Sequence, residues 1–190
     1  MDVDLGLRDR LVRAGVELLR SEGPTALTLR EIARRAGVSH GAPRRHFPTH
    51  LSLLSAIAAA GFTSLAQRCD AALSGPEADT RRRLALLAGV YLDFAASERG
   101  MFELMFRHDL LESGHLGLRY TSLPLFRLLT TLIAETRATP APEVTAAALW
   151  SALHGLAQLR AWGSLRLVTG SDDIGPTLDA ILTAHLGPAT

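Results

Sequence analysis

The sequence has no lysine, only one cysteine and no long apolar run. Because Cys69 stands alone, an internal disulfide and a cysteine-rich zinc site are excluded. A bilayer span needs ~20 apolar residues, a length that no segment approaches. Asp2 and Asp4 also stand where a secretory signal carries positive charge. We therefore expect a cytoplasmic protein without a membrane partner.

The period-two runs of Val, Ile and Thr that are typical of strands are also missing, while apolar residues recur at helical spacing. The sequence therefore predicts an all-α fold, and an apolar fraction of 47% is enough for a sizeable core. A phosphate-binding loop, a nucleophile–base spacing and a metal-ligand pattern are absent, so no cofactor is expected. The alternative hypothesis of an all-α enzyme that uses His108, His115 and His154 is supported only by the types of these residues.

Positive charge is concentrated near the N-terminus. Residues 1–50 hold nine arginines against six acidic residues, whereas residues 51–190 hold eleven against thirteen. Five of the nine arginines lie between Arg30 and His50, where Glu31 is the only acidic residue. Such a cluster is typical of a surface that binds a polyanion, although an ordinary solvated face can show the same pattern.

The same region carries signals for two short helices joined by a tight turn. Thr28 and Glu31 have the spacing of a capping box, in which each side chain accepts the backbone N–H of the other residue. This helix should end by Gly37, whose missing Cβ suits a left-handed cap. Ser39 is placed to cap the next helix. The pattern over residues 28–47 therefore predicts a helix-turn-helix.

The second of these helices turns His40, Arg44 and Arg45 outward, with a size and charge that suit the major groove of DNA. Pro43 lies close to the start of this helix, where its ring crowds the carbonyl of Ser39 and is expected to loosen the turn. The alternative to a DNA reader is an ordinary α-hairpin with an exposed basic helix.

The stretch LREIARRAGVSHGAPRRHFPTHLSLL after Thr28 resembles the N-terminal domain of TetR-family transcriptional regulators, and LVRAGVELLRSEG resembles that family's first helix. The resemblance implies a DNA-binding domain over residues 1–48. It implies a ligand-binding and dimerisation domain over residues 49–190, entered by a long fourth helix that ends near Leu73. The pattern and the resemblance together predict DNA contacts from Thr28, Arg30, Ser39, His40, Arg44, Arg45, His46 and His50.

Two positions depart from the family. Arg44 stands where a tyrosine is usual and His50 where a lysine is usual. A guanidinium can bind a phosphate or a guanine through two hydrogen bonds, so we expect a different operator preference. A histidine is largely neutral at pH 7, so one phosphate contact becomes pH-dependent. His46 and His50 have the spacing of metal ligands, but Pro48 between them breaks the helix and no metal site is expected.

Helices rich in methionine and phenylalanine follow the linker SGPEADT, and such side chains build either a core or an adaptable apolar cavity. The glycine-rich LESGHLGLRYTSLP is expected to interrupt the helices as a lid or an entry, before a helix resumes at Leu125. His154 is either a polar anchor for an effector or a satisfied buried histidine. The bulky residues expected to converge on an apolar effector are Phe62, Phe94, Met101, Met105, Phe126 and Trp150.

A helix from Glu143 to about Leu165 is apolar nearly all round, so burial on several sides is expected. Its WSALHG segment resembles the Trp-x-x-x-His-Gly signature of a TetR-like C-terminal subfamily. In that family the last two helices form a four-helix dimer interface; packing within one chain is the alternative. The interface residues expected here are Ala147, Ser151, Gly155, Ile174, Leu178, Ile181 and Leu182.

These observations predict a homodimeric regulator that binds double-stranded operator DNA and is released from it by an apolar or aromatic small molecule. A DNA-binding nucleoid or activator protein without an effector is the alternative.

Overall fold

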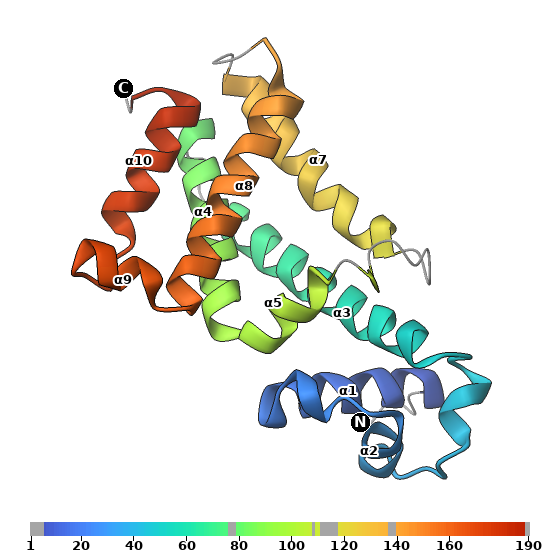
Figure 1. The fold of residues 1–190 in the computed structure, drawn as a ribbon. Coiled ribbons are helices and arrows are strands. Elements are labelled where there is room, and N and C mark those ends of the chain that lie inside the picture. Colours follow the sequence, from blue (N-terminus) through green and yellow to red (C-terminus); the bar gives the residue numbers. More distant parts are fainter. Residues whose placement is uncertain (1–5, 76–78, 108, 111–117, 137–139, 189–190) are drawn as a thin grey trace. The chain divides into compact units, whose positions relative to one another are not determined.

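The computed structural model describes residues 6–75, 79–107, 109–110, 118–136 and 140–188, and all regular elements in these ranges are helices (Figure 1). The all-α prediction is confirmed. In the same ranges, none of the helices is both long and apolar enough to span a bilayer. Contacts divide the chain into two compact units, Met1–Ser64 with Glu98–Ser122, and Leu65–Ser97 with Leu123–Thr190.

The first unit begins with α1 (Leu7–Glu22), the first helix expected from the sequence, whose apolar stripe includes the buried Leu11 and Leu18. After the short 3-10 turn η1 (Pro24–Ala26), α2 (Leu29–Arg35) packs against α1. Two arginines tie these helices together. Arg10 donates to the carbonyl of Ala36 at 3.2 Å, and Arg35 pairs with Glu22 at 2.5 Å.

Both ends of α2 lie where the sequence predicts them. The Thr28 hydroxyl accepts the backbone N–H of Glu31 at 3.2 Å. The return half of the expected capping box is wrong, because the Glu31 carboxylate binds Arg34 at 2.5 and 2.8 Å instead. At the other end Gly37 adopts the left-handed conformation (φ +68°), and the Val38 N–H reaches the Ala33 carbonyl at 3.0 Å.

The expected second helix of the helix-turn-helix is shorter than predicted. The structure has a single 3-10 turn, η2 (Ala42–Arg45), and the Ser39 side chain does not cap it. Pro43 provides the reason: it has no N–H to give to the Ser39 carbonyl, and its ring crowds that oxygen. The Ser39 carbonyl accepts instead from Ala42 at 3.0 Å. Buried Phe47 then anchors the segment under the Arg8 guanidinium, 5.4 Å from the ring centroid.

The long fourth helix is confirmed as α3 (His50–Leu73). Thr49 and Ser52 cap it reciprocally, because the Ser52 N–H donates to the Thr49 hydroxyl at 3.0 Å and the Thr49 N–H to the Ser52 hydroxyl at 3.2 Å. Residues 50–64 of α3 belong to the first unit and the remainder to the second.

The first unit also contains α5 (Arg99–Met105), which packs against α1. The Arg20 guanidinium donates to both carboxylate oxygens of Glu98, at 2.9 and 3.1 Å. Gly100 lets the backbone of α5 approach Leu19, since a Cβ there would lie 3.3 Å from that side chain. The start of α5 is therefore tied to α1 by both charge and packing.

The second unit contains α4 (Thr80–Ser97), most of α7 (Leu118–Thr136), α8 (Pro142–Ala161), α9 (Ser164–Thr169) and α10 (Gly175–Leu186). Helix α8 packs against α4, α9 and α10. The predicted linker and lid lie partly outside the described residues, at 76–78 and 111–117.

Two sequence expectations for these helices are wrong. First, α7 starts at Leu118 and not at Leu125, with Pro124 inside it. Pro124 removes the hydrogen bond to the Tyr120 carbonyl, but both residues are exposed, so water can replace it. Second, the helix expected to reach residue 165 ends at Ala161, because Gly163 adopts the left-handed conformation (φ +74°) and α9 begins after it. Trp162 therefore follows α8.

The burial of α8 also differs from the expectation. One side is buried, through Leu149, Leu153 and Leu156, but Ala147 and Ser151 on another side are exposed. In a single chain this helix therefore has an open face.

Candidate nucleic-acid interface and effector site

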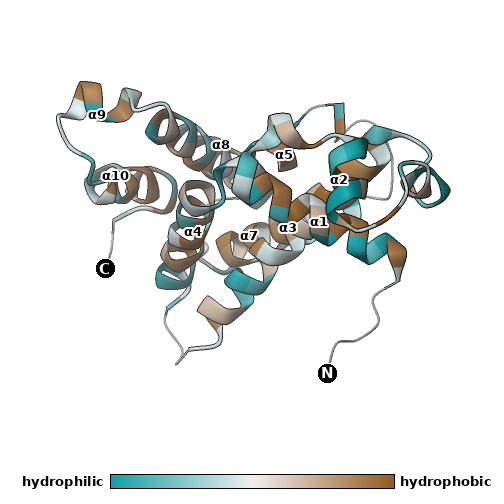
Figure 2. Ribbon diagram, turned by 90° about the horizontal axis from the view of Figure 1, so that it is seen from below, coloured by the Kyte–Doolittle hydropathy of each residue, from teal (hydrophilic) through white to brown (hydrophobic). Residues whose placement is uncertain are grey.

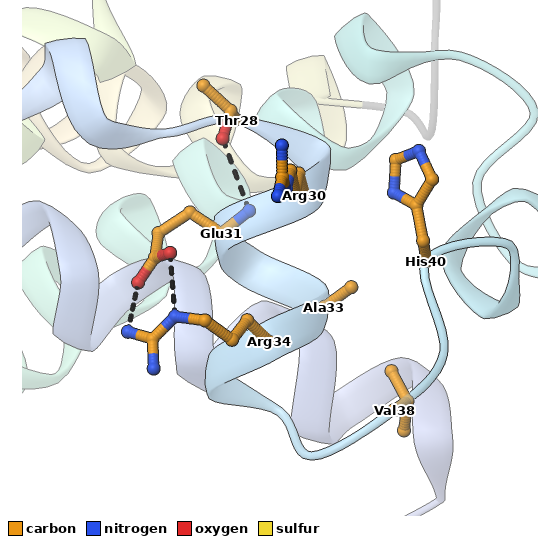
Figure 3. Close-up of a pocket in the computed structure, with 7 residues that line it drawn as sticks. All are labelled: Thr28, Arg30, Glu31, Ala33, Arg34, Val38 and His40. Carbon is orange, nitrogen blue, oxygen red and sulfur yellow. Dashed lines mark hydrogen bonds and ion pairs between the residues drawn. The ribbon is translucent and has the colours of Figure 1, made fainter.

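A surface hollow of about 350 Å³ lies beside α2 in the first unit, between that helix and the segment leading to η2 (Figure 3). Thr28 and Arg30 from the start of α2 line it together with His40 from the turn. Tertiary structure therefore brings three of the expected DNA-contacting residues to one concave surface. Hydroxyl, guanidinium and imidazole N–H groups are all donors that can bind phosphate oxygens.

The arginines of this unit separate into two groups. Arg34 and Arg35 are held by Glu31 and Glu22, and Arg34 lowers the pKa of the Glu31 carboxyl by hydrogen bonding to it. In contrast, Arg30, Arg44 and Arg45 are exposed and have no partner among the described residues. Their charge is uncompensated locally, as a phosphate-binding surface requires.

The turn η2 and the residue that follows it carry three expected DNA-contacting residues, Arg44, Arg45 and His46, and all are exposed. Pro43 is the buried residue of this turn. Its fixed φ angle and the two backbone N–H groups that bind its carbonyl, from His46 at 3.0 Å and Phe47 at 2.8 Å, hold the turn in shape. Ser39 is exposed as well, and its DNA contact stays a prediction although its predicted cap is absent.

His50 has a role within the protein that sequence reasoning missed. Its Nε2 lies 2.6 Å from the carbonyl oxygen of Leu27, so the ring donates this hydrogen bond and joins α3 to the segment before α2. A contact 23 residues away in sequence leaves no local signal. The phosphate contact at His50 stays a prediction. Among the described residues no group of three or more His, Cys, Asp or Glu side chains is placed to hold a metal ion.

The residues expected at an effector site fall into clusters within each unit. In the first unit Phe62, Met101 and Met105 are buried, and the two methionines meet at Gly61, where a Cβ would lie 2.6 and 2.7 Å from their sulfur atoms. The Phe62 ring also contacts Phe106 edge-on, with centroids 5.6 Å apart. This packing supports the core interpretation of the methionines and phenylalanines.

The second unit holds a different cluster, made by Phe126, Trp150 and His154. The Phe126 and Trp150 ring centroids are 6.4 Å apart, and those of Trp150 and His154 are 6.1 Å apart. Phe94 lies elsewhere in this unit, buried under the Arg68 guanidinium at 4.9 Å.

Tyr91 organises the second cluster, and the sequence did not identify it as a site residue. Its hydroxyl accepts the Trp150 indole N–H at 3.2 Å and is hydrogen-bonded to Nδ1 of His154 at 2.8 Å. Burial lowers the pKa of His154 and raises that of Tyr91. The available signal was that a tyrosine in an apolar stripe needs a partner for its hydroxyl.

The expected dimer residues are partly accessible in the single chain. Ala147 and Ser151 are exposed and Gly155 is half-buried, while Ile174, Leu178 and Ile181 on or next to α10 are half-buried. A Cβ at Gly155 would meet no atom of the described chain within 4 Å. Leu182 is buried in its own unit. Contacts within a single chain are therefore sufficient to bury Leu182.

Residues 11–57 match the family described as bacterial regulatory proteins, tetR family, and residues 84–184 match the tetracyclin repressor-like, C-terminal domain. A nucleoid occlusion factor SlmA from Aliivibrio fischeri (strain MJ11) is 32% identical over 105 residues, 55% of this chain and 53% of that protein. The chain thus spans about half the length of the curated relatives it matches.

Two solved structures cover nearly the whole chain. A protein with unknown function from Rhodococcus sp. RHA1 has a TM-score of 0.75 and 29% identity, with 95% of this chain and 91% of that chain covered. The multidrug binding protein EbrR complexed with ethidium has a TM-score of 0.66 and 25% identity, with 97% and 100% covered. Since the C-terminal family model alone spans more than half of the residues, the chain belongs to the TetR family.

Proposed function

We propose that the protein is a homodimeric repressor that leaves its operator when an apolar or aromatic small molecule binds. The observation that carries DNA binding is the set of exposed guanidiniums at Arg30, Arg44 and Arg45, which have no partner in the part of the chain that the structure describes. A dimer would present two copies of η2 to successive major grooves, which lie about 34 to 36 Å apart. The operator is accordingly a near-palindrome on cytoplasmic DNA.

The effector part of the proposal is supported by the cluster around Tyr91, Trp150 and His154. Aromatic faces suit a flat apolar molecule, and the linked hydroxyl, indole and imidazole groups supply a few polar contacts. EbrR, at 25% identity over almost the full length of both chains, is a multidrug binding protein complexed with ethidium. An effector releases DNA only if it binds the DNA-free form more tightly.

The test uses the full chain and its two tryptophans. Ethidium, added without DNA, is expected to raise the melting temperature and to change tryptophan emission. Trp162→Phe should keep the emission change and Trp150→Phe should abolish it. If ethidium gives this response, it is then added to the protein bound to labelled upstream DNA, where it should lower the fluorescence anisotropy of the DNA.

A regulator without an effector is the second candidate, because the curated relatives at 32% identity are nucleoid occlusion factors. In that case a broad panel of aromatic compounds would leave both the melting temperature and the DNA affinity unchanged. Arg44→Ala and Arg45→Ala would weaken DNA binding in either case, so the two candidates are separable.

A further inference from the structure

The position of α2 depends on what is attached to its two ends, because the helix itself is short. It has seven residues, of which Ile32 and Ala33 are buried, and Figure 2 shows mainly hydrophilic colour on it. A helix of this length is not stable without tertiary contacts. Two of the proposed DNA-contacting side chains, Thr28 and Arg30, lie where this helix begins. Whatever holds that end in place therefore affects DNA binding.

The two ends of α2 are attached to different helices. The C-terminal end is attached to α1 by the hydrogen bond from Arg10 and the ion pair of Arg35. The N-terminal end is attached to α3, where Nε2 of His50 donates to the carbonyl oxygen of Leu27 at 2.6 Å. In the described part of the chain, the remaining hydrogen bonds of residues 24–31 are local. His50 is thus the long-range polar contact of this end.

The His50 hydrogen bond fixes the peptide group through which the chain enters α2. The peptide group between Leu27 and Thr28 is planar, so its C=O and N–H turn together. Its C=O accepts from His50, and its N–H donates to the Ala26 carbonyl at 2.7 Å. Both polar groups of this peptide are therefore held, and the backbone of Thr28 follows from their orientation.

We infer that His50 is a positioning residue for DNA binding, which places the Thr28 and Arg30 side chains in place of making the phosphate contact expected from the sequence. The inference rests on the proposed DNA contacts of α2. A carbonyl oxygen only accepts, so Nε2 of His50 carries the proton in this bond. In a neutral imidazole the other nitrogen, Nδ1, then has no proton to give to a phosphate oxygen. The reciprocal cap at the start of α3 holds the backbone that carries the ring.

The test measures binding of labelled upstream DNA by the full-length wild type, His50→Leu and His50→Gln across a salt series. His50→Leu removes the donor, but His50 is exposed, so water can reach the Leu27 carbonyl and the fold should survive. Binding should weaken by about threefold to tenfold, the range of one net hydrogen bond, with an unchanged salt slope. His50→Gln keeps a neutral N–H donor and should bind like wild type. A salt slope flattened by about one unit in both variants would identify a phosphate contact and overturn the inference.

A double-mutant cycle separates an effect through α2 from a general disturbance of the first unit. His50→Leu should weaken binding less in an Arg30→Ala background than in wild type, because one of the side chains that it positions is already missing. Arg44→Ala is the matched control background. Arg44 is equally exposed but lies on η2, so His50→Leu should keep its full effect there. Additive effects with Arg30→Ala, or the same loss of additivity in both backgrounds, would contradict the inference.

Hydrogen exchange of the free protein follows the two ends of α2 separately. In His50→Leu the amide protons of Thr28 and Glu31 should exchange faster, whereas that of Val38, which is bonded to the Ala33 carbonyl, should exchange as in wild type. His50→Gln should restore the slow exchange. Unchanged exchange at Thr28 and Glu31 would overturn this inference alone. A wild type that binds no upstream DNA would overturn it together with the proposed function.

Discussion

At the level of single side chains, the first unit uses arginine for two different purposes. Arg10, Arg20 and Arg35 hold the domain together through a helix-end carbonyl or an acidic partner. Arg44 and Arg45 project from η2 without a partner in the described chain. Removing a cation of the first kind should disturb the fold, whereas removing one of the second kind should disturb only DNA binding.

Arg44→Ala and Arg45→Ala are each expected to weaken operator binding, and at least one should flatten the slope of log affinity against log salt by about one unit, since each lost phosphate contact means that fewer counterions are released on binding. Mobility shifts with upstream DNA across a salt series measure both effects. Arg127→Ala removes from α7 an exposed arginine that has no partner among the described residues, and it is the matched control. Unchanged binding in both η2 variants would contradict the proposed interface.

His154 is expected to make stability depend on pH. Burial lowers its pKa in the folded state from 6.5, so below about pH 6.5 the unfolded chain binds more protons than the folded chain. The free energy of unfolding should therefore fall as the pH is lowered through this window. His154→Gln cannot titrate, so denaturant titrations at pH 7 and 5 should show a smaller difference for this variant. An identical difference in both proteins would be inconsistent with a half-buried neutral imidazole.

At the level of helices and turns, the two ends of α2 were predicted correctly, whereas the cap at Ser39 and the extents of η2, α7 and α8 were not. Thr28 and Gly37 mark the ends of α2 as predicted, because both signals act on neighbouring backbone groups. The length of η2 depends on whether Pro43 prevents the longer helix that the surrounding residues favour. The start of α7 depends on whether water can replace the hydrogen bond that Pro124 removes. The local sequence pattern alone does not show how long η2 is or where α7 starts.

Gly37→Ala is expected to destabilise the full chain by roughly 1 to 2 kcal/mol, the cost of a left-handed conformation for a residue with a Cβ. A Cβ at this position would meet no atom of the described chain within 4 Å, so the backbone is the sole cause. Gly41→Ala is the matched control, since Gly41 is equally open but has φ −84°. Urea unfolding measures both; equal effects of the two substitutions would refute the conformational argument.

For the molecule as a whole, the described contacts group the helices differently from their order in the chain. Residues 98–122 join the N-terminal helices in one compact unit, and α3 contributes to both units. The expected boundary between the DNA-binding domain and the ligand-binding domain, between residues 48 and 49, stays a prediction. The expected effector residues likewise divide between the units, with Phe62, Met101 and Met105 in one and Phe126, Trp150 and His154 in the other.

Gly155→Leu is expected to give a folded monomer that binds DNA poorly. The single chain has room for the first atoms of a larger side chain here, so the fold should survive. A closely packed partner helix would be overfilled in two symmetric copies, at a cost of several kcal/mol. Sedimentation and circular dichroism together distinguish the outcomes: a folded dimer as tight as wild type would place this face away from the partner.

The sequence by itself determined the all-α class, the helix-turn-helix and the concentration of arginine near it. Periodicity, capping and charge are properties of neighbouring residues, so they can be read along the chain. Tertiary structure decided which arginines are engaged and which are open, and which aromatic residues meet. Those outcomes depend on pairs far apart in sequence, such as Tyr91 with His154, 63 residues on, and Arg20 with Glu98, 78 residues on. Only folding brings such groups within hydrogen-bond distance.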